Sequence, residues 1–144
     1  MAIKIRRKSR AEKDKTLTLR ISDKNKFALE LLATIQGRSL SSIVMEALQE
    51  PLKAGLTREK KEGRNIVPIY IPDVAYDLLP PDRFVKLALA APDLLTEREK
   101  VLWKVITENP AYMNEDTPNF KTIRLRWESI QTDADELLDK YSDQ

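Results

Sequence analysis

The sequence predicts a mainly α-helical protein in two parts: a short strand-helix-helix unit near the N-terminus, then a small helical domain. The hydrophobic period changes from two to about 3.6 soon after residue 21, and the apolar pattern stops between residues 54 and 65. The charge also changes sign there. Residues 1–65 carry 16 lysines and arginines against 8 acidic residues, a net of +8, and residues 66–144 carry 9 against 15, a net of −6. This split indicates a basic part directed at a polyanion and an acidic part with another task.

Composition limits the classes of function. The chain has no cysteine and no histidine, which excludes disulfides, thiol nucleophiles, and the commonest metal ligand and general base. No nucleophile elbow, phosphate loop or dinucleotide fingerprint is present. We therefore expect no enzyme, no cofactor and no metal site. No apolar run approaches the roughly 18 residues of a membrane span, so we expect a cytoplasmic protein with no membrane partner.

Residues 1–14 form a basic arm with two interpretations. The arm is either a solubilising tail or a segment, disordered when free, that lies along the DNA backbone or enters the minor groove. In the second case it adds affinity that depends on salt. Its cationic side chains are Lys4, Arg6, Arg7, Lys8 and Arg10.

The stretch KTLTLRIS, residues 15–22, predicts a strand. Apolar and polar residues alternate along it, as expected when one strand face is buried and the other is open. The apolar face consists of Leu17, Leu19 and Ile21, and the open face of Thr16, Thr18 and Arg20. No nearby segment looks able to pair with this strand, and an isolated strand leaves its backbone donors and acceptors unpaired.

Two amphipathic helices follow the strand. In the first, Phe27 and Leu31 recur at helical spacing, Ser22 or Asp23 can cap the start, and Gly37 suits the left-handed residue after the end. In the second, Ser39 is the expected N-cap, and Pro51 and Gly55 are expected to bring the helix to a close. Its apolar face includes Leu40, Val44 and Leu48. The unit, residues 15–53, is too small to fold alone.

A second copy of the chain solves the pairing problem. Strands from two chains can pair antiparallel while four helices bury both apolar faces. The paired ribbon then presents its threonines and Arg20 twice on one open face, and the major groove of B-DNA admits such a ribbon. The core of this homodimer would contain Leu17, Leu19, Ile21, Phe27, Leu31, Leu40, Val44 and Leu48.

The strand TLTLRIS, the helix after it and the GRSLSS turn that opens the next helix resemble the ribbon-helix-helix family of DNA-binding proteins, the MetJ/Arc type. The match covers residues 15–53. The resemblance implies an obligate dimer, base reading by the open strand face and phosphate clamping by the start of the second helix. By position, the implied base readers are Thr16, Thr18 and Arg20, and the implied phosphate-binding residues are Arg38, Ser39, Leu40 and Ser41. Helix N-termini bind phosphate through free amides, and no carboxylate lies in the first turn after Ser39.

A linker at 54–65 is expected to join this unit to an acidic helical domain at 66–144. The stretch NIVPIYIPD reads as extended, because Pro68 and Pro72 confine it to an edge strand or an irregular segment. A helix is then expected at 82–91. A further helix starts at Thr96, with Glu99 as its capping-box partner, and ends before Pro110.

The last predicted helix, 119–141, carries a heptad seam. Its apolar residues are Phe120, Ile123, Trp127, Ile130, Ala134, Leu137 and Tyr141. Two interpretations remain open: the seam packs inside its own domain, or it contacts another chain and builds a higher oligomer. Thr132 is a candidate break in this helix. The acidic residues near its end, such as Asp133, Asp135 and Glu136, are most simply a solvated face and do not by themselves make an acid/base site.

These expectations combine into one functional prediction. The chain is expected to be a homodimeric, sequence-specific protein that binds double-stranded DNA and acts as a transcriptional repressor. Its C-terminal domain is expected to oligomerise or to recruit a protein partner. Two alternatives remain: an antitoxin that represses its own promoter and wraps a toxin with its C-terminal part, and a conjugation or partition accessory protein. Eight of the nine aromatic residues lie in residues 66–144, which disfavours an antitoxin tail that orders only on binding.

Overall fold

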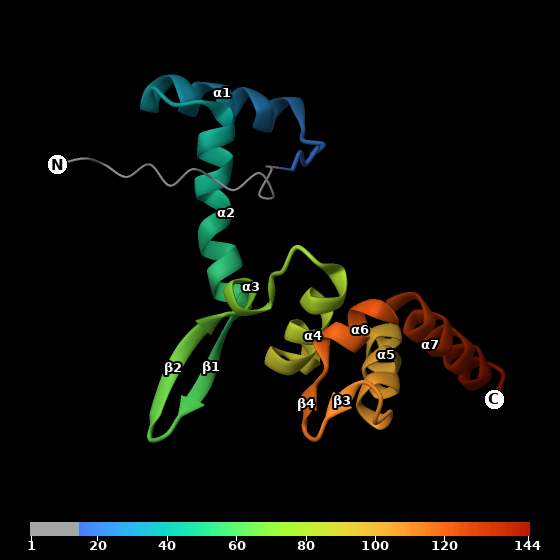
Figure 1. The fold of residues 1–144 in the computed structure, drawn as a ribbon. Coiled ribbons are helices and arrows are strands. Elements are labelled where there is room, and N and C mark those ends of the chain that lie inside the picture. The colour runs from blue at the N-terminus through green and yellow to red at the C-terminus, as the bar shows by residue number, and fades with distance from the viewer. Residues whose placement is uncertain (1–14) are drawn as a thin grey trace. The chain divides into compact units, whose positions relative to one another are not determined.

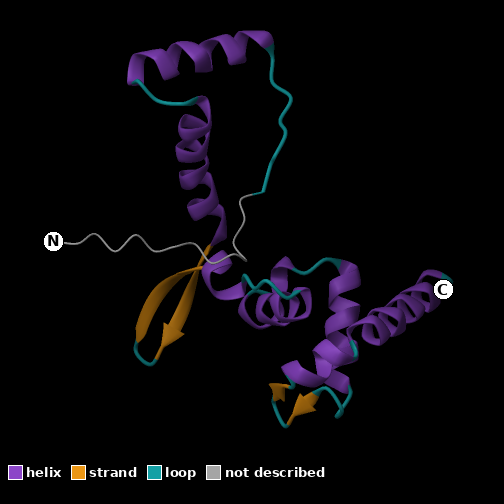
Figure 2. Cartoon of the chain, turned by 45° about the horizontal axis from the view of Figure 1, so that its top comes forward, coloured by secondary structure: helices purple, strands orange, loops and turns teal. Residues whose placement is uncertain are grey.

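The computed structural model describes residues 15–144, so the predicted basic arm lies outside the described residues. The chain divides into two compact units, one ending at Gly55 and the other comprising Leu56–Gln144 (Figure 1). Over the described residues the protein is mainly helical, with two small antiparallel two-stranded sheets (Figure 2). This confirms the coarse fold class. No helix within residues 15–144 combines the length and apolarity that crossing a membrane requires.

The first unit contains helices α1 (Asp23–Gln36) and α2 (Leu40–Leu56). The side chain of Ser22 caps α1 by accepting a hydrogen bond from the Asn25 amide at 3.2 Å. Gly37 ends α1 in the left-handed conformation at φ 60°, where a glycine has no Cβ penalty. Both capping predictions are confirmed. Figure 1 shows the two helices meeting at the turn that joins them and diverging from there.

The predicted strand at 15–22 has no regular secondary structure in the single chain. A β-strand is defined by hydrogen bonds to a neighbouring strand, and residues 15–144 of a single copy pair no strand with this segment. Pairing with a second copy therefore stays a prediction.

The region from Pro51 to residue 65 differs from the prediction. Helix α2 continues through Pro51 and ends at Leu56, so neither Pro51 nor Gly55 closes it. Residues 54–65 are not an irregular linker: they contain the end of α2 and strand β1 (Thr57–Glu62), which pairs antiparallel with β2 (Asn65–Tyr70). The stretch TREKKE carries no apolar alternation. Its strand is set by cross-strand pairing with NIVPIY, which its own sequence does not reveal.

Strand β2 is an edge strand, one of the two alternatives predicted for it. Pro68 lies opposite Glu59 in the two-stranded sheet, where a missing backbone donor is tolerated. The short helix α3 (Ile71–Ala75) follows directly and was not predicted. Ile69, at the end of β2, packs against a small apolar cluster of Ile71, Ala75 and Ala91. The base of the hairpin is therefore anchored on its own unit.

The rest of the second unit is helical. Helix α4 (Pro80–Ala90) precedes a 3-10 turn, η1 (Pro92–Leu94), and α5 (Glu97–Glu108) starts at the predicted capping box of Thr96 and Glu99. A short hairpin of β3 (Met113–Asn114) and β4 (Thr117–Pro118) leads into α6 (Phe120–Leu125) and α7 (Trp127–Ser142). The predicted last helix is thus broken at Arg126 and not at Thr132.

The core of the second unit lies between α4, α5, α6 and α7. Its fully buried side chains include Val85, Leu102 and Ile106. Phe84 packs against both tryptophans, with its ring centroid 6.2 Å from that of Trp103 and 5.7 Å from that of Trp127. Because both tryptophans belong to this unit, tryptophan fluorescence reports on its packing alone.

Most of the predicted heptad seam is buried within this core. Ile123, Ile130 and Ala134 are at most 1% exposed, and Phe120 and Trp127 pack against the same cluster. Tyr141, at the end of the seam, is 54% exposed. The structure favours internal packing over contact with another chain along residues 119–141.

Two surface carboxylates in this unit predict how its stability changes as the pH is lowered. The hydrogen bond from Lys86 holds the pKa of Asp77 below its ordinary value, and the hydrogen bond from Arg98 does the same for the pKa of Asp135. Because both pKa values are lower in the folded state, the unfolded state binds protons more tightly. The stability from these pairs is present above the unfolded pKa of about 3.9 and is lost as pH falls through the folded values.

We therefore expect the variant Asp77→Asn/Asp135→Asn to lose less stability than the wild type between pH 5 and pH 2. The measurement is the urea midpoint, followed by tryptophan fluorescence at a series of pH values. Asp116→Asn/Asp143→Asn is the matched control, since neither carboxylate forms an ion pair within residues 15–144. Parallel pH curves for wild type and the Asp77/Asp135 variant would contradict the assignment.

Candidate nucleic-acid interface

The segment at 15–21 lies beside α2 with its two faces differently placed. Leu17, Leu19 and Ile21 line a groove of about 810 Å³, together with Leu40, Ser41, Val44, Met45 and Leu48 of α2 and with Lys15, Arg20, Lys26 and Leu29. Thr16 and Thr18 are exposed and do not line the groove. The predicted apolar residues therefore line the groove, and the two threonines do not. Arg20, which was predicted to share the open face with the threonines, lines the groove as well.

The groove and the helices leave much apolar surface uncovered. In a single chain Leu17 is 74% exposed, Phe27 61% and Ile35 81%. Of the eight predicted dimer-core residues, only Val44 is even partly buried, and the other seven are exposed. Helix α1 has no buried residue. Among the described residues of this unit only Ile43 is buried, so one copy has almost no core here.

The start of α2 has the features of an anion site. Ser39 Oγ accepts a hydrogen bond from the Ser42 amide at 3.1 Å, which confirms Ser39 as the N-cap. No acidic residue lies in the first turn. The amides of Leu40 and Ser41 have no hydrogen-bond acceptor among residues 15–144, and such amides point along the helix dipole toward an incoming anion.

Arg38 is engaged within its own unit. Its guanidinium forms an ion pair with Glu46 and donates a hydrogen bond to Ser42 Oγ at 2.8 Å. No local sequence pattern reveals this pair, because Arg38 precedes the helix and its separation from Glu46 along the chain matches no i,i+3 or i,i+4 spacing. A phosphate at this helix end would compete with Glu46 for Arg38.

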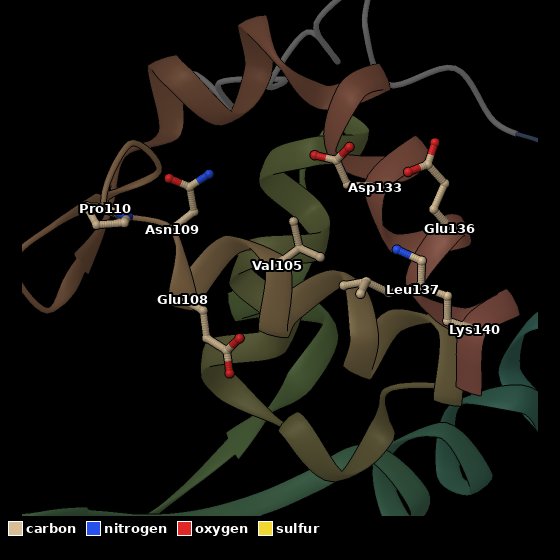
Figure 3. Close-up of a pocket in the computed structure, with 8 residues that line it drawn as sticks. All are labelled: Val105, Glu108, Asn109, Pro110, Asp133, Glu136, Leu137 and Lys140. Atoms are coloured by element: carbon tan, nitrogen blue, oxygen red, sulfur yellow. The ribbon is translucent and has the colours of Figure 1, made fainter. Parts of the chain in front are cut away.

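The second unit contains an acidic groove of about 440 Å³ between α5 and α7 (Figure 3). Glu108, Asp133 and Glu136 contribute carboxylates, Lys140 contributes an ammonium group, and Val105 and Leu137 contribute apolar surface. Asp135 is not part of this groove, since its carboxylate accepts two hydrogen bonds from Arg98, at 2.7 and 3.0 Å. With three carboxylates and one ammonium group, the lining of this groove has a net negative charge.

No metal centre is evident: among residues 15–144, no three acidic side chains are grouped so that they could hold a metal ion. Comparison of the chain with protein-family models, curated proteins and solved structures gives no match.

Proposed function

We propose that the protein is a homodimeric, sequence-specific DNA-binding protein that acts as a transcriptional repressor. The observation that carries the proposal is the first unit itself: a segment without regular secondary structure and two helices, with apolar residues that are almost entirely exposed in one chain. Exposed apolar surface of this extent marks an interaction site. A second copy of the same unit covers it with the same residues, as the self-complementarity of a two-fold interface requires.

Antiparallel pairing of two copies of residues 15–21 turns this unit into a DNA reader. The apolar side chains of this segment line the groove beside α2, and Thr16 and Thr18 do not line it. A two-stranded ribbon of this kind fits the major groove. There the Thr16 and Thr18 methyl groups can contact thymine, and Arg20 can donate two hydrogen bonds to guanine once it swings out of the groove.

The start of α2 supplies the phosphate contact in this proposal. The free amides of Leu40 and Ser41 bind one backbone phosphate in each half-site, and Ser39 fixes the helix start that orients them. Arg38 leaves its ion pair with Glu46 and donates a charged hydrogen bond to the phosphate.

The packed core of the second unit bears on the alternatives. An antitoxin tail that folds on its toxin is poor in buried aromatic side chains when free, whereas this unit buries Phe84 beside two tryptophans. This argues against the antitoxin interpretation. A repressor and a conjugation or partition accessory protein share the same DNA-binding unit, and the position of the bound sites relative to promoters separates the two.

The test is to select binding sites for the full-length protein from a random DNA library and then to titrate affinity against salt. We expect a short inverted repeat and steep salt dependence. Arg20→Ala is expected to cost about 1–3 kcal/mol at the selected site and to relax the preference for guanine. Lys53→Ala removes the same charge from the last turn of α2 and serves as the control.

Two results would refute these assignments separately. An Arg20→Ala affinity within a factor of two of wild type would remove Arg20 from the base-reading set. If selection returned no common sequence, and binding to random DNA were insensitive to salt, the proposed function would be wrong.

A further inference from the structure

We propose that the β1–β2 hairpin makes a second contact with DNA and binds the phosphate backbone outside the base-reading site. This inference rests on the proposed function, because it adds to the same DNA complex. It begins from a charge separation inside the second unit. Residues 57–70 carry four lysines and arginines against two glutamates, whereas residues 71–144 carry 9 against 15. The hairpin therefore has a net charge of +2, and residues 71–144 have a net charge of −6.

The hairpin holds its cations on an exposed projection. Figures 1 and 2 show the two strands extending away from helices α4–α7 of their own unit, with the turn farthest from them. The exposure follows the same gradient: Thr57 and Arg58 at the base are half-buried, whereas every residue from Glu59 to Ile66 is exposed. Glu59 and Lys60 still line a groove with Val74 and Leu89, whereas residues 61–66 at the tip are exposed throughout.

The turn is built for a narrow tip. Glu62 pairs with Asn65, so Gly63 and Arg64 form a two-residue turn. Gly63 has φ 61°, a left-handed value that glycine adopts without strain, and Arg64 has a negative φ. This combination belongs to the tight hairpin turns that match the twist of the flanking strands. A narrow two-stranded ribbon with a basic tip can lie along the phosphate backbone of DNA.

The cations near the tip are available to an outside anion. Lys61 and Arg64 form no ion pair with any residue in 15–144. Lys60 lies 3.7 Å from Glu62, and both side chains are more than half exposed, so water and salt screen this pair. Arg58, by contrast, lies at the half-buried base near Asp93 and is left out of the proposed contact.

The chemistry fits phosphate better than base edges. Lysine is a flexible point charge, and contacts of lysine and arginine with phosphate position a protein without reading sequence. Each phosphate contact made this way releases counterions, so its signature is the slope of affinity against salt. The acidic remainder of the unit would be repelled by the backbone, which favours an approach with the hairpin first.

The experiment uses the full-length protein, the DNA site selected by the wild type, and the variant Lys61→Gln/Arg64→Gln. We expect the slope of log K against log salt to become shallower by about 0.9 for each phosphate that the variant no longer neutralises, up to about 3.6 for a dimer. Hydroxyl-radical footprinting should show weaker protection outside the inverted repeat, with protection inside it retained. The charge-preserving variant Lys61→Arg/Arg64→Lys should keep the wild-type slope and footprint.

Lys121→Gln/Arg126→Gln is the matched control, since it removes the same charge from exposed positions in the same unit, away from the hairpin. Its slope and footprint should remain those of wild type. A wild-type slope and footprint in the Lys61/Arg64 variant would overturn the hairpin contact and would leave the lysines a role only in preventing edge-to-edge strand pairing. If the wild-type protein itself bound no DNA, the proposed function would fail together with this inference.

Discussion

The variant Phe27→Glu is expected to abolish both the dimer and specific DNA binding while leaving the second unit folded. Phe27 is 61% exposed in a single chain, so a charge there costs a free monomer little. In the proposed dimer the same ring is buried, and truncating a buried phenylalanine costs about 3–5 kcal/mol. A two-fold interface contains the substitution twice, so the dissociation constant of the dimer should rise about 10⁴-fold or more.

The readouts separate loss of the dimer from loss of fold. Sedimentation equilibrium measures the dimer, a gel-shift titration with the selected site measures DNA binding, and tryptophan fluorescence reports only on the second unit. Asn25→Glu is the control, because it introduces the same charge two residues earlier in α1, on the opposite side of the helix from Phe27. A dimeric Phe27→Glu variant that binds the selected site like wild type would eliminate the proposed dimer core.

The parts of this fold that could be predicted depend on short-range signals. The caps of α1 at Ser22 and Gly37 and the capping box of α5 were found because each needs only residues within one turn of the helix end. The internal packing of the heptad seam was one of two open interpretations, since a seam of apolar residues looks the same whether its partner is in the same chain or in another.

The parts that were missed depend on residues far apart in the sequence. Strand β1 is polar throughout and exists because β2 pairs with it. The break at Arg126 separates α6 from α7, which both contribute to the same core, and no glycine or proline marks it. At the candidate interface, the leucine and threonine faces of residues 15–21 could be predicted from alternation, but the pairing of Arg38 with Glu46 could not.

A further large effect is expected at the ion pair that joins α4 to α6. Arg124 donates to both carboxylate oxygens of Asp82, at 2.7 and 2.5 Å. Asp82 is the one buried charged residue among those described, at 5% exposure, whereas 46% of the Arg124 side chain remains exposed. The two partners are separated by 42 residues in the sequence, which is why no local pattern reveals them.

This asymmetry predicts unequal costs for removing each partner. Arg124→Ala leaves the Asp82 carboxylate buried without its partner, so we expect a measurable loss of unfolding free energy. The loss should be smaller than that for a fully buried pair, because water reaches the Arg124 side of the contact. Asp82→Ala should cost less, since Arg124 can turn to water, and Asp82→Ala/Arg124→Ala should recover part of the loss of Arg124→Ala.

Urea unfolding followed by tryptophan fluorescence measures all three variants, because both tryptophans lie in this unit. Arg98→Ala provides a control with the same two-hydrogen-bond geometry but with an Asp135 carboxylate that is 51% exposed. If Arg98→Ala and Arg124→Ala lost equal stability, burial of the carboxylate would not be the cause. If Asp82→Ala were the worst of the set, Asp82 would have a structural role beyond accepting the two hydrogen bonds of Arg124, such as filling space between α4 and α6.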